Sequence, residues 1–227
     1  MKSDSGGIRR TPASIPLSGK TTATALLAAF LMLRGAAQGQ TVEKSLAALG
    51  SSPTLGSSDA HVAIVEFSDF QCSYCKKFWA DTLPPLKEIY INKGQARFTY
   101  RHFAILGKSS QQAAQATECA GEQGKFWGYH DRLFANQGGL AFTDSKLNQY
   151  ARELRVNGGK FAECLNSGRY RRKVEEEIAV AASLGARGTP TFFVNNRLLV
   201  GAQPFEVFRA VIEAELKAKV TKEKQTK

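Results

Sequence analysis

The sequence predicts a small α/β domain that is interrupted by an α-helical insertion. Two short β-branched and apolar runs, 61–67 and 96–105, have the pattern of buried strands, and a helical segment separates them. A second pair of short strands follows only after the proline-free stretch 107–186, which is rich in Ala, Gln, Glu and Lys and has helical periodicity. Of the 227 residues, 43% are hydrophobic and 22% charged, which excludes global disorder, collagen and coiled coil.

The first 39 residues are typical of a targeting segment. A basic flank precedes the uncharged run 21–33, and small residues follow, so we expect a secretory signal peptide cut after Gly39, or an uncleaved anchor. Residues 1–39 carry a net charge of +4, which leaves about +7 of the total of +11 for the exported part. Export also places the four cysteines in an oxidising compartment.

The first half of the α/β domain covers 61–106, after a Ser/Gly/Ala-rich stretch, 40–60, that reads as a linker. After the first strand a helix begins near Cys75. Pro84 and Pro85 should bend or restart this helix, because proline removes a backbone donor and clashes with the preceding turn.

The insertion and the second half of the domain follow in order. The helices expected in the insertion are 109–122, 126–136, 143–154 and 159–185, the last broken near Ser167 and Gly168. The second half, 187–220, holds a strand at 191–194, a hairpin turn at Asn195 and Asn196, a return strand at 198–200 and a helix at 204–217. A basic tail, 221–227, is expected to be solvated.

The motif Cys72-Ser73-Tyr74-Cys75 lies between the first strand and the first helix. A helix N-terminus offers unpaired amides and the positive end of the helix dipole, which stabilise a thiolate and lower its pKa. Cys75 lies one turn further in, close enough to attack a mixed disulfide formed through Cys72. Half of a zinc site and a purely structural disulfide are the alternatives. The strand–turn–helix context and the absence of a second cysteine pair or a histidine pair at ligand spacing favour a redox pair without metal or cofactor.

The segment 64–75 resembles the active-site segment of DsbA-like thiol–disulfide oxidoreductases. The resemblance continues at 100–103, around Cys119, at 125–134 and at 188–192, and covers roughly 60–217. It implies a thioredoxin-like fold interrupted by an α-helical insertion domain.

The resemblance also implies roles for individual residues. Pro190 matches the cis-proline that faces the active-site sulfurs, and Thr189 the residue whose backbone pairs with an extended substrate. Glu66 matches a buried acid that exchanges a proton with Cys75. The position of Glu66 is itself unusual, because an ionised side chain inside an apolar strand is costly. The alternative is that Glu66 lies on the surface of an edge strand. Phe70 and Tyr74 are expected to offer apolar surface to the substrate.

Two pairs of residues remain to be assigned. Cys119 and Cys164 fall in different helices of the insertion, and with export they are expected to form a structural disulfide, as in some relatives; two separate buried thiols are the alternative. We interpret His102 and His130 as packing or hydrogen-bonding residues rather than as metal ligands.

The leading functional hypothesis is an exported oxidase that introduces disulfides into reduced or unfolded protein substrates. A membrane partner, quinone-linked or vitamin-K-epoxide-reductase-like, would reoxidise it, and a monomer in the periplasm or another extracytoplasmic space is expected. Ser-Tyr between the cysteines and Thr before Pro190 depart from the best-known oxidant, so a reductase or isomerase is the alternative. A non-enzymatic metal-binding or partner-binding protein is less consistent with two retained cysteines. The basic residues are not interleaved with aromatic ones, so nucleic-acid binding is not expected.

Overall fold

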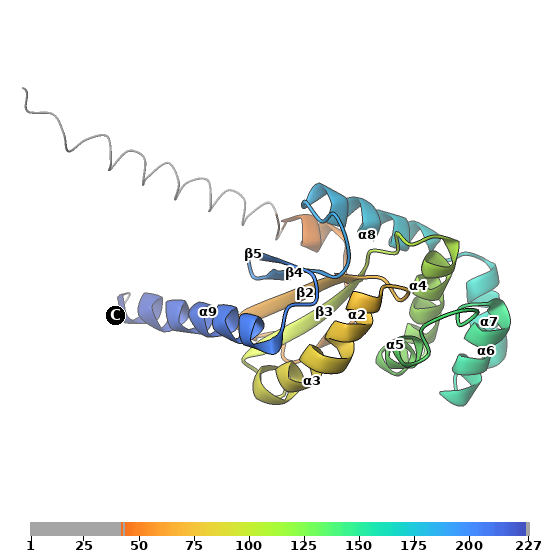
Figure 1. Ribbon diagram of the computed structural model, residues 1–227, viewed down its shortest axis with the longest axis horizontal. Helices are drawn as coiled ribbons and strands as arrows, with labels where there is room; N and C mark the ends of the chain where they lie inside the picture. The colour runs from red at the N-terminus through yellow and green to blue at the C-terminus, as the bar shows by residue number, and fades with distance from the viewer. Residues whose placement is uncertain (1–41, 43, 226–227) are drawn as a thin grey trace, which may run out of the picture. The chain divides into compact units, whose positions relative to one another are not determined.

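A five-stranded mixed sheet forms the α/β domain (Figure 1). The computed structural model describes residue 42 and residues 44–225. The sheet has the order β1-β3-β2-β4-β5, in which β2 and β3 are parallel and the other neighbours are antiparallel. The strands are β1 (Thr54–Leu55), β2 (Val62–Ser68), β3 (Ala96–His102), β4 (Thr191–Val194) and β5 (Arg197–Val200).

The two faces of the sheet are covered by different helices. Side chains alternate along β2, so Val62 and Ile64 pack with α3 (Leu83–Leu86) and α9 (Phe205–Gln225). Val65 and Phe67 point the other way, where Ala181 of α8 (Arg171–Ser183) packs against them. Figure 1 shows α8 on one side of the sheet and α3 and α9 on the other.

The predicted effect of the two prolines is confirmed. The helical segment begins as α2 (Ser73–Lys77), passes through a π-helical turn (Phe78–Thr82), restarts as α3 and ends in a second π-helical turn (Lys87–Ile91). Pro84 and Pro85 lie in the first turn of α3, where their missing amide donors are tolerated.

The insertion contains five helices within the described residues. They are α4 (Lys108–Gly121), α5 (Phe126–Ala135), α6 (Asp144–Glu153), α7 (Gly158–Asn166) and α8. The predicted break near Ser167 is confirmed, since Gly168 adopts a φ of +64° between α7 and α8. The boundary of the insertion is less sharp than the sequence predicts, because α8 packs on the sheet.

The prediction that 40–60 is only a linker is wrong. Residues 44–48 are helical, and β1 adds a strand to the sheet beside β3. The Arg101 guanidinium holds this segment by donating hydrogen bonds to the carbonyl oxygens of Leu46 at 3.3 Å and Gly50 at 2.8 Å. The composition of 40–60 does not indicate this contact, because the residue that anchors the segment, Arg101, lies on β3.

Two terminal predictions have different outcomes. The predicted end of the last helix at 217 is wrong, because α9 continues to Gln225. Thr221 in this part of α9 is exposed, as expected for a solvated tail. The leader, 1–39, lies outside the described residues. Within the part that the structure describes, no helix is long and apolar enough to cross a membrane.

Candidate active site

The two cysteines of the motif lie where the sequence places them, at the start of α2. Cys72 is the N-terminal capping residue and Cys75 lies in the first turn, and both are free thiols. The first turn of α2 contains no acidic residue, so nothing there offsets the positive end of the helix dipole.

The loop between β2 and α2 is fixed by two side chains that the sequence analysis did not single out. Asp69 is buried, and its carboxylate accepts hydrogen bonds from the Gln71 and Leu106 amides and the Ser110 hydroxyl, at 2.8, 3.0 and 2.6 Å. Gln137 donates from Nε2 to the carbonyl oxygens of Phe70 and Cys72, at 2.7 and 2.9 Å. No sequence signal marks these two residues as part of the site. Asp69 stands at the end of a strand, where surface acids are common, and Gln137 belongs to no motif.

Cys72 carries the more acidic thiol. Its Sγ donates a hydrogen bond to the carbonyl oxygen of Thr189 at 3.2 Å, and the Thr189–Pro190 peptide bond is cis, as predicted. The side chain of Cys75 is the main cause that lowers the pKa of Cys72 to about 6. Burial opposes this shift, whereas the side chain of Thr189 and the backbone amides of Cys75 and Tyr74 add to it. A thiol with this pKa is mostly thiolate at neutral pH.

Cys75 and Glu66 form the buried side of the site. Burial raises the pKa of Cys75 well above its usual range, and contact with Cys72 and the nearby Glu66 charge add to this effect. Glu66 lies on β2 and is only 1% exposed, so the alternative of a surface acid is wrong. Burial raises the pKa of Glu66 to about 8, the Ser68 hydroxyl opposes the shift, and Cys72 adds to it. Glu66 is therefore mostly protonated at neutral pH.

The two aromatic residues predicted to face the substrate differ in position. Tyr74, two residues after Cys72, is 63% exposed. Phe70 is buried and stacks on Tyr100, with ring centroids 5.3 Å apart, so the prediction that it offers surface to a substrate is wrong. From the sequence alone, a phenylalanine that precedes a reactive motif can equally well be buried in the core beneath that motif.

The two histidines are buried and hydrogen-bonded, as predicted. His102 Nε2 lies 3.0 Å from Glu118 Oε1, and His130 Nδ1 lies 2.9 Å from Asp131 Oδ1. Burial lowers the pKa of His130, so its ring is neutral at pH 7. Among the described residues, no group of three His, Cys, Asp or Glu side chains is arranged to hold a metal ion.

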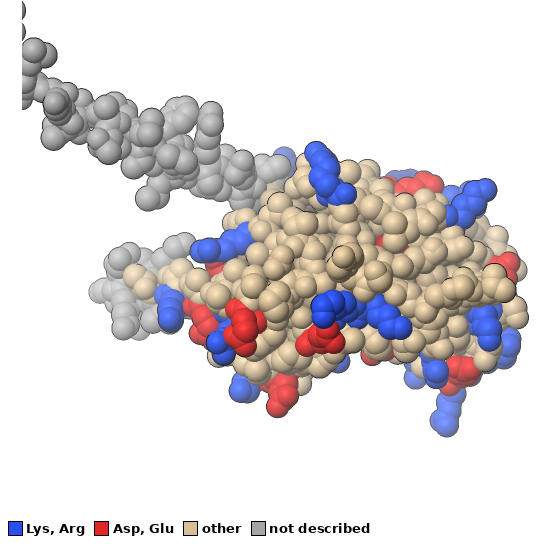
Figure 2. Space-filling view, viewed as in Figure 1, with Lys and Arg blue, Asp and Glu red and all other residues tan. Residues whose placement is uncertain are grey.

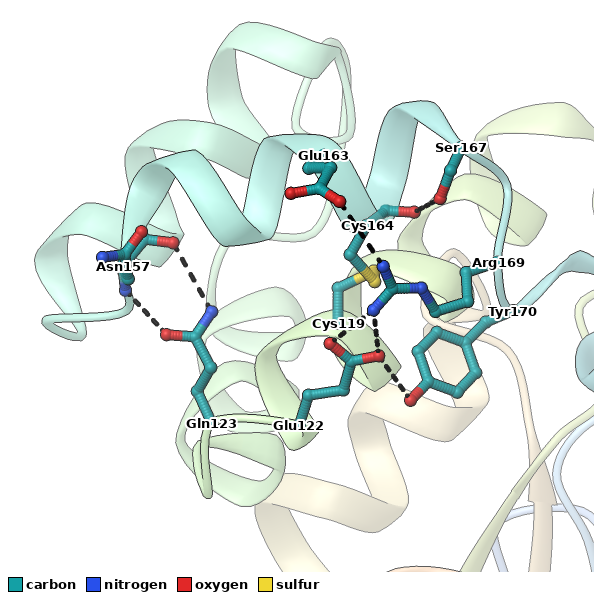
Figure 3. The surroundings of a disulfide bond; sticks show 9 residues. All are labelled: Cys119, Glu122, Gln123, Asn157, Glu163, Cys164, Ser167, Arg169 and Tyr170. Atoms are coloured by element: carbon teal, nitrogen blue, oxygen red, sulfur yellow. Dashed lines mark hydrogen bonds and ion pairs between the residues drawn. A yellow bond between two sulfur atoms is a disulfide. The ribbon is translucent and has the colours of Figure 1, made fainter.

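Cys119 of α4 and Cys164 of α7 form the predicted disulfide, with Cα atoms 5.8 Å apart (Figure 3). Polar contacts flank it on both sides. Gln123 and Asn157 exchange two hydrogen bonds, at 2.8 and 3.4 Å. On the other side, Glu122, which follows the last residue of α4, accepts hydrogen bonds from Arg169 and Tyr170. The disulfide therefore has polar contacts on both sides, and these contacts connect the end of α4 with the residues that precede α7 and α8.

The sheet, the Cys-x-x-Cys helix and the cis-proline loop beside Cys72 together define a thioredoxin-fold dithiol protein. A family described as thioredoxin matches residues 49–214. The probable disulfide bond formation protein D of Bacillus cereus is 33% identical over 178 residues, which cover 75% of this chain and 81% of the relative. The chain therefore belongs to the thioredoxin family and is related within it to the disulfide bond formation proteins D.

Two further similarities concern a solved structure and a group of much longer proteins. The crystal structure of oxidised BdbD from Bacillus subtilis has a TM-score of 0.69 and 29% identity, covering 73% of this chain and 93% of that one. The Na(+)/H(+) antiporter NhaA 3 of Salinispora tropica is 31% identical over 208 residues, 84% of this chain. The chain spans only 31% of the length of that antiporter, and 24% of a second one from Salinispora arenicola.

Proposed function

We propose that this protein oxidises dithiols in other proteins, with Cys72 as the sulfur that exchanges with the substrate. A substrate thiolate attacks Cys72 of the oxidised pair, the Cys72–Cys75 bond breaks, and a mixed disulfide forms at Cys72. Cys75 leaves and takes a proton, for which the protonated Glu66 is the donor. A second substrate thiolate then attacks the substrate sulfur of the mixed disulfide and releases Cys72 as a thiolate.

The observation that carries this proposal is the stabilised thiolate of Cys72. Its pKa of about 6 lies well below that of an ordinary thiol. Stabilising the thiolate stabilises the reduced protein, and a more stable reduced form makes the disulfide a stronger oxidant. The same thiolate is a good leaving group, which speeds release of the oxidised substrate. Both effects favour an oxidase over a reductase.

The surface around Cys72 supports a polypeptide substrate. Large apolar side chains are exposed on three segments near it: Tyr74 of the motif, Leu106, whose amide binds Asp69, and Leu140, which is 80% exposed. Leu140 follows Gln137, which holds the Cys72 carbonyl, and lines a cavity of about 340 Å³ together with Gln71. Unfolded chains expose apolar side chains that these three residues can contact, whereas folded proteins bury most of their apolar side chains.

The charge distribution gives no support to a nucleic-acid function. On the face that Figure 2 shows, Lys and Arg side chains lie singly or in small groups among Asp and Glu, and they form no continuous basic patch.

The setting that fits this chemistry is extracytoplasmic, with a membrane protein, quinone-linked or vitamin-K-epoxide-reductase-like, that reoxidises the Cys72–Cys75 pair. The Cys119–Cys164 bridge supports this setting, because disulfides persist in oxidising compartments. We further propose that the protein acts as a monomer after export directed by its N-terminal segment.

The decisive experiment is equilibration of the Cys72–Cys75 pair with glutathione buffers, read by alkylation and mass spectrometry. We expect a potential near the oxidising end of the thioredoxin family, between those of protein disulfide isomerase and DsbA at about −180 and −120 mV. A value near that of thioredoxin, about −270 mV, would identify a reductase instead. The Cys72→Ser variant is the control and should show no exchange at all.

A further inference from the structure

A row of buried polar side chains lies on the sheet face next to Cys75. Glu66 and Ser68 are two residues apart on β2, so they point to the same face. In the parallel register Glu66 lies opposite Tyr100 and Ser68 opposite His102 on β3. Each of these four residues is only 1% exposed.

Four polar atoms in this row have no hydrogen-bond partner within the described part of the chain: Glu66 Oε1, Ser68 Oγ, Tyr100 Oη and His102 Nδ1. A buried polar atom without a partner costs about 1–3 kcal/mol, and such atoms are few in native proteins. Four of them lie in one row, and two of their residues, Glu66 and Tyr100, interact electrostatically with Cys75, which indicates a role in the chemistry rather than in stability.

The electrostatic influences show how close these groups are. Burial raises the pKa of Tyr100 well above its usual range, the charges of Glu66 and Cys75 add to this effect, and the Ser68 hydroxyl opposes it. The Ser68 hydroxyl likewise opposes the rise in the pKa of Glu66, which burial causes. Ser68 is therefore near both groups, although its Oγ forms no hydrogen bond within the described part of the chain. The row therefore runs from Cys75 through Glu66 and Ser68 to the Tyr100 hydroxyl.

Groups from the surrounding elements complete the environment of Glu66. Cys72 and Cys75 face it from α2, and the apolar Phe192 lies opposite it on β4. Arg101 follows Tyr100 on β3, but its side chain binds Glu177 of α8, on the other face. Besides Glu66 and Cys75, three further titratable groups act on or pack against Tyr100: Asp69 through its charge, and His102 and His130 with ring centroids 5.3 and 4.9 Å away.

We propose that Ser68 and Tyr100 are positioning residues whose unpaired hydroxyl groups stabilise the Glu66 carboxylate when Glu66 exchanges a proton with Cys75. The inference rests on the proposed function and adds two residues to its site. When Cys75 leaves the disulfide, the proton of Glu66 moves to the Cys75 sulfur, and Ser68 stabilises the resulting carboxylate, with Tyr100 supporting Ser68. In the reverse direction the carboxylate takes the proton of Cys75 as Cys75 attacks a mixed disulfide.

The experiment measures this reverse step. Protein carrying glutathione on Cys72 is prepared, and the rate at which Cys75 expels glutathione is followed from acidic to alkaline pH. The rate should rise with pH as Glu66 ionises. Removing a hydroxyl that stabilises the carboxylate moves the midpoint upward, by about one pH unit for Ser68→Ala, the size of a lost hydrogen bond to a charged group. Tyr100→Phe should give a smaller shift in the same direction, because it acts through Ser68.

Tyr129→Phe is the matched control. Tyr129 is a buried tyrosine whose hydroxyl donates to the Leu147 carbonyl within the insertion, so its loss should leave the midpoint unchanged. Tyr100→Phe is not expected to destabilise the fold, since its hydroxyl has no partner in the described part of the chain. A structural role would change stability and leave the pH midpoint where it was.

Every outcome is decisive. Unchanged midpoints in both variants would overturn the proposal, and an unchanged midpoint in Tyr100→Phe alone would remove Tyr100 from it. Glu66→Gln separates this inference from the proposed function. If that variant keeps the wild-type pH dependence, the titrating group is another one, and the proton role of Glu66 itself fails.

Discussion

The Cys72 sulfur donates a hydrogen bond to the carbonyl oxygen of Thr189 at 3.2 Å, although 117 residues separate them in sequence. The contact joins the two halves of the α/β domain across the insertion. It brings the backbone that precedes the cis-proline to the reactive sulfur, which is where an extended substrate would have to lie.

Titration of the reduced protein should show the Cys72 thiolate with a midpoint near pH 6, seen as ultraviolet absorbance of the thiolate or as the rate of alkylation. Because the Cys75 side chain is the main cause that lowers the pKa of Cys72, Cys75→Ala should move this midpoint upward. Ser73→Ala changes an exposed residue of the same turn and serves as the control. An unchanged midpoint in Cys75→Ala would show that the helix N-terminus alone stabilises the thiolate.

Replacing Glu66 with Gln should stabilise the reduced protein, and the gain should grow with pH. The folded-state pKa of Glu66 is raised from 4.5 to about 8, so the folded form holds a proton that the unfolded form releases. The contribution of protonated Glu66 to stability is therefore fully present below pH 4.5 and is lost as the pH rises through 8, by about 5 kcal/mol in total. Urea unfolding of both proteins at several pH values checks this. A constant difference would show that Glu66 has an ordinary pKa in the fold.

Removing the Cys119–Cys164 bridge should destabilise the protein without altering the redox equilibrium of Cys72 and Cys75. The bridge closes a loop with a sequence separation of 45 residues, and its loss costs at most about 4 kcal/mol by the chain-entropy estimate. Denaturant unfolding of Cys119→Ser/Cys164→Ser measures the loss, and Cys72→Ser/Cys75→Ser, which removes the other pair, is the control. A changed glutathione equilibrium in the first variant would instead show that the bridge shapes the active site.

Arg101 should be necessary to hold the segment before β1. Arg101→Met leaves Glu177 charged and buried without its partner at 2.9 Å, which should cost about 3–5 kcal/mol and expose residues near Gly50 to proteolysis. The double variant Arg101→Met/Glu177→Gln removes the stranded charge and keeps an acceptor for the His102 amide. It should therefore be more stable than the single variant. Equal stability of the two would mean that the ion pair is not the cause.

The sequence predicts local features of this protein better than long-range ones. The position of the cysteine pair, the restart of the helix at Pro84 and the break at Gly168 follow from short-range chemistry, and all agree with the structure. Glu66 is identified because a charged residue within an apolar strand is unusual wherever that strand lies.

The residues that were missed depend on contacts between distant segments. Phe70 is buried because its ring packs against Tyr100 on β3 and Phe134 in the insertion. The anchoring of the segment before β1 depends on Arg101, and the hold on the Cys72 carbonyl depends on Gln137. None of these partners is indicated by composition or periodicity, because each contact exists only once the fold has formed.

The packing of α8 has a consequence for how the protein meets its substrates. By sequence this helix belongs to the insertion, yet Ala181 packs against the sheet residues Val65 and Phe67, and Glu177 binds both Arg101 and the His102 amide of β3. A helix shared in this way ties the insertion to the sheet, so hinge bending between the two is restrained. The shape of the surface around Cys72 is then largely preset, and adaptation falls to the substrate, which must be pliable enough to conform to it.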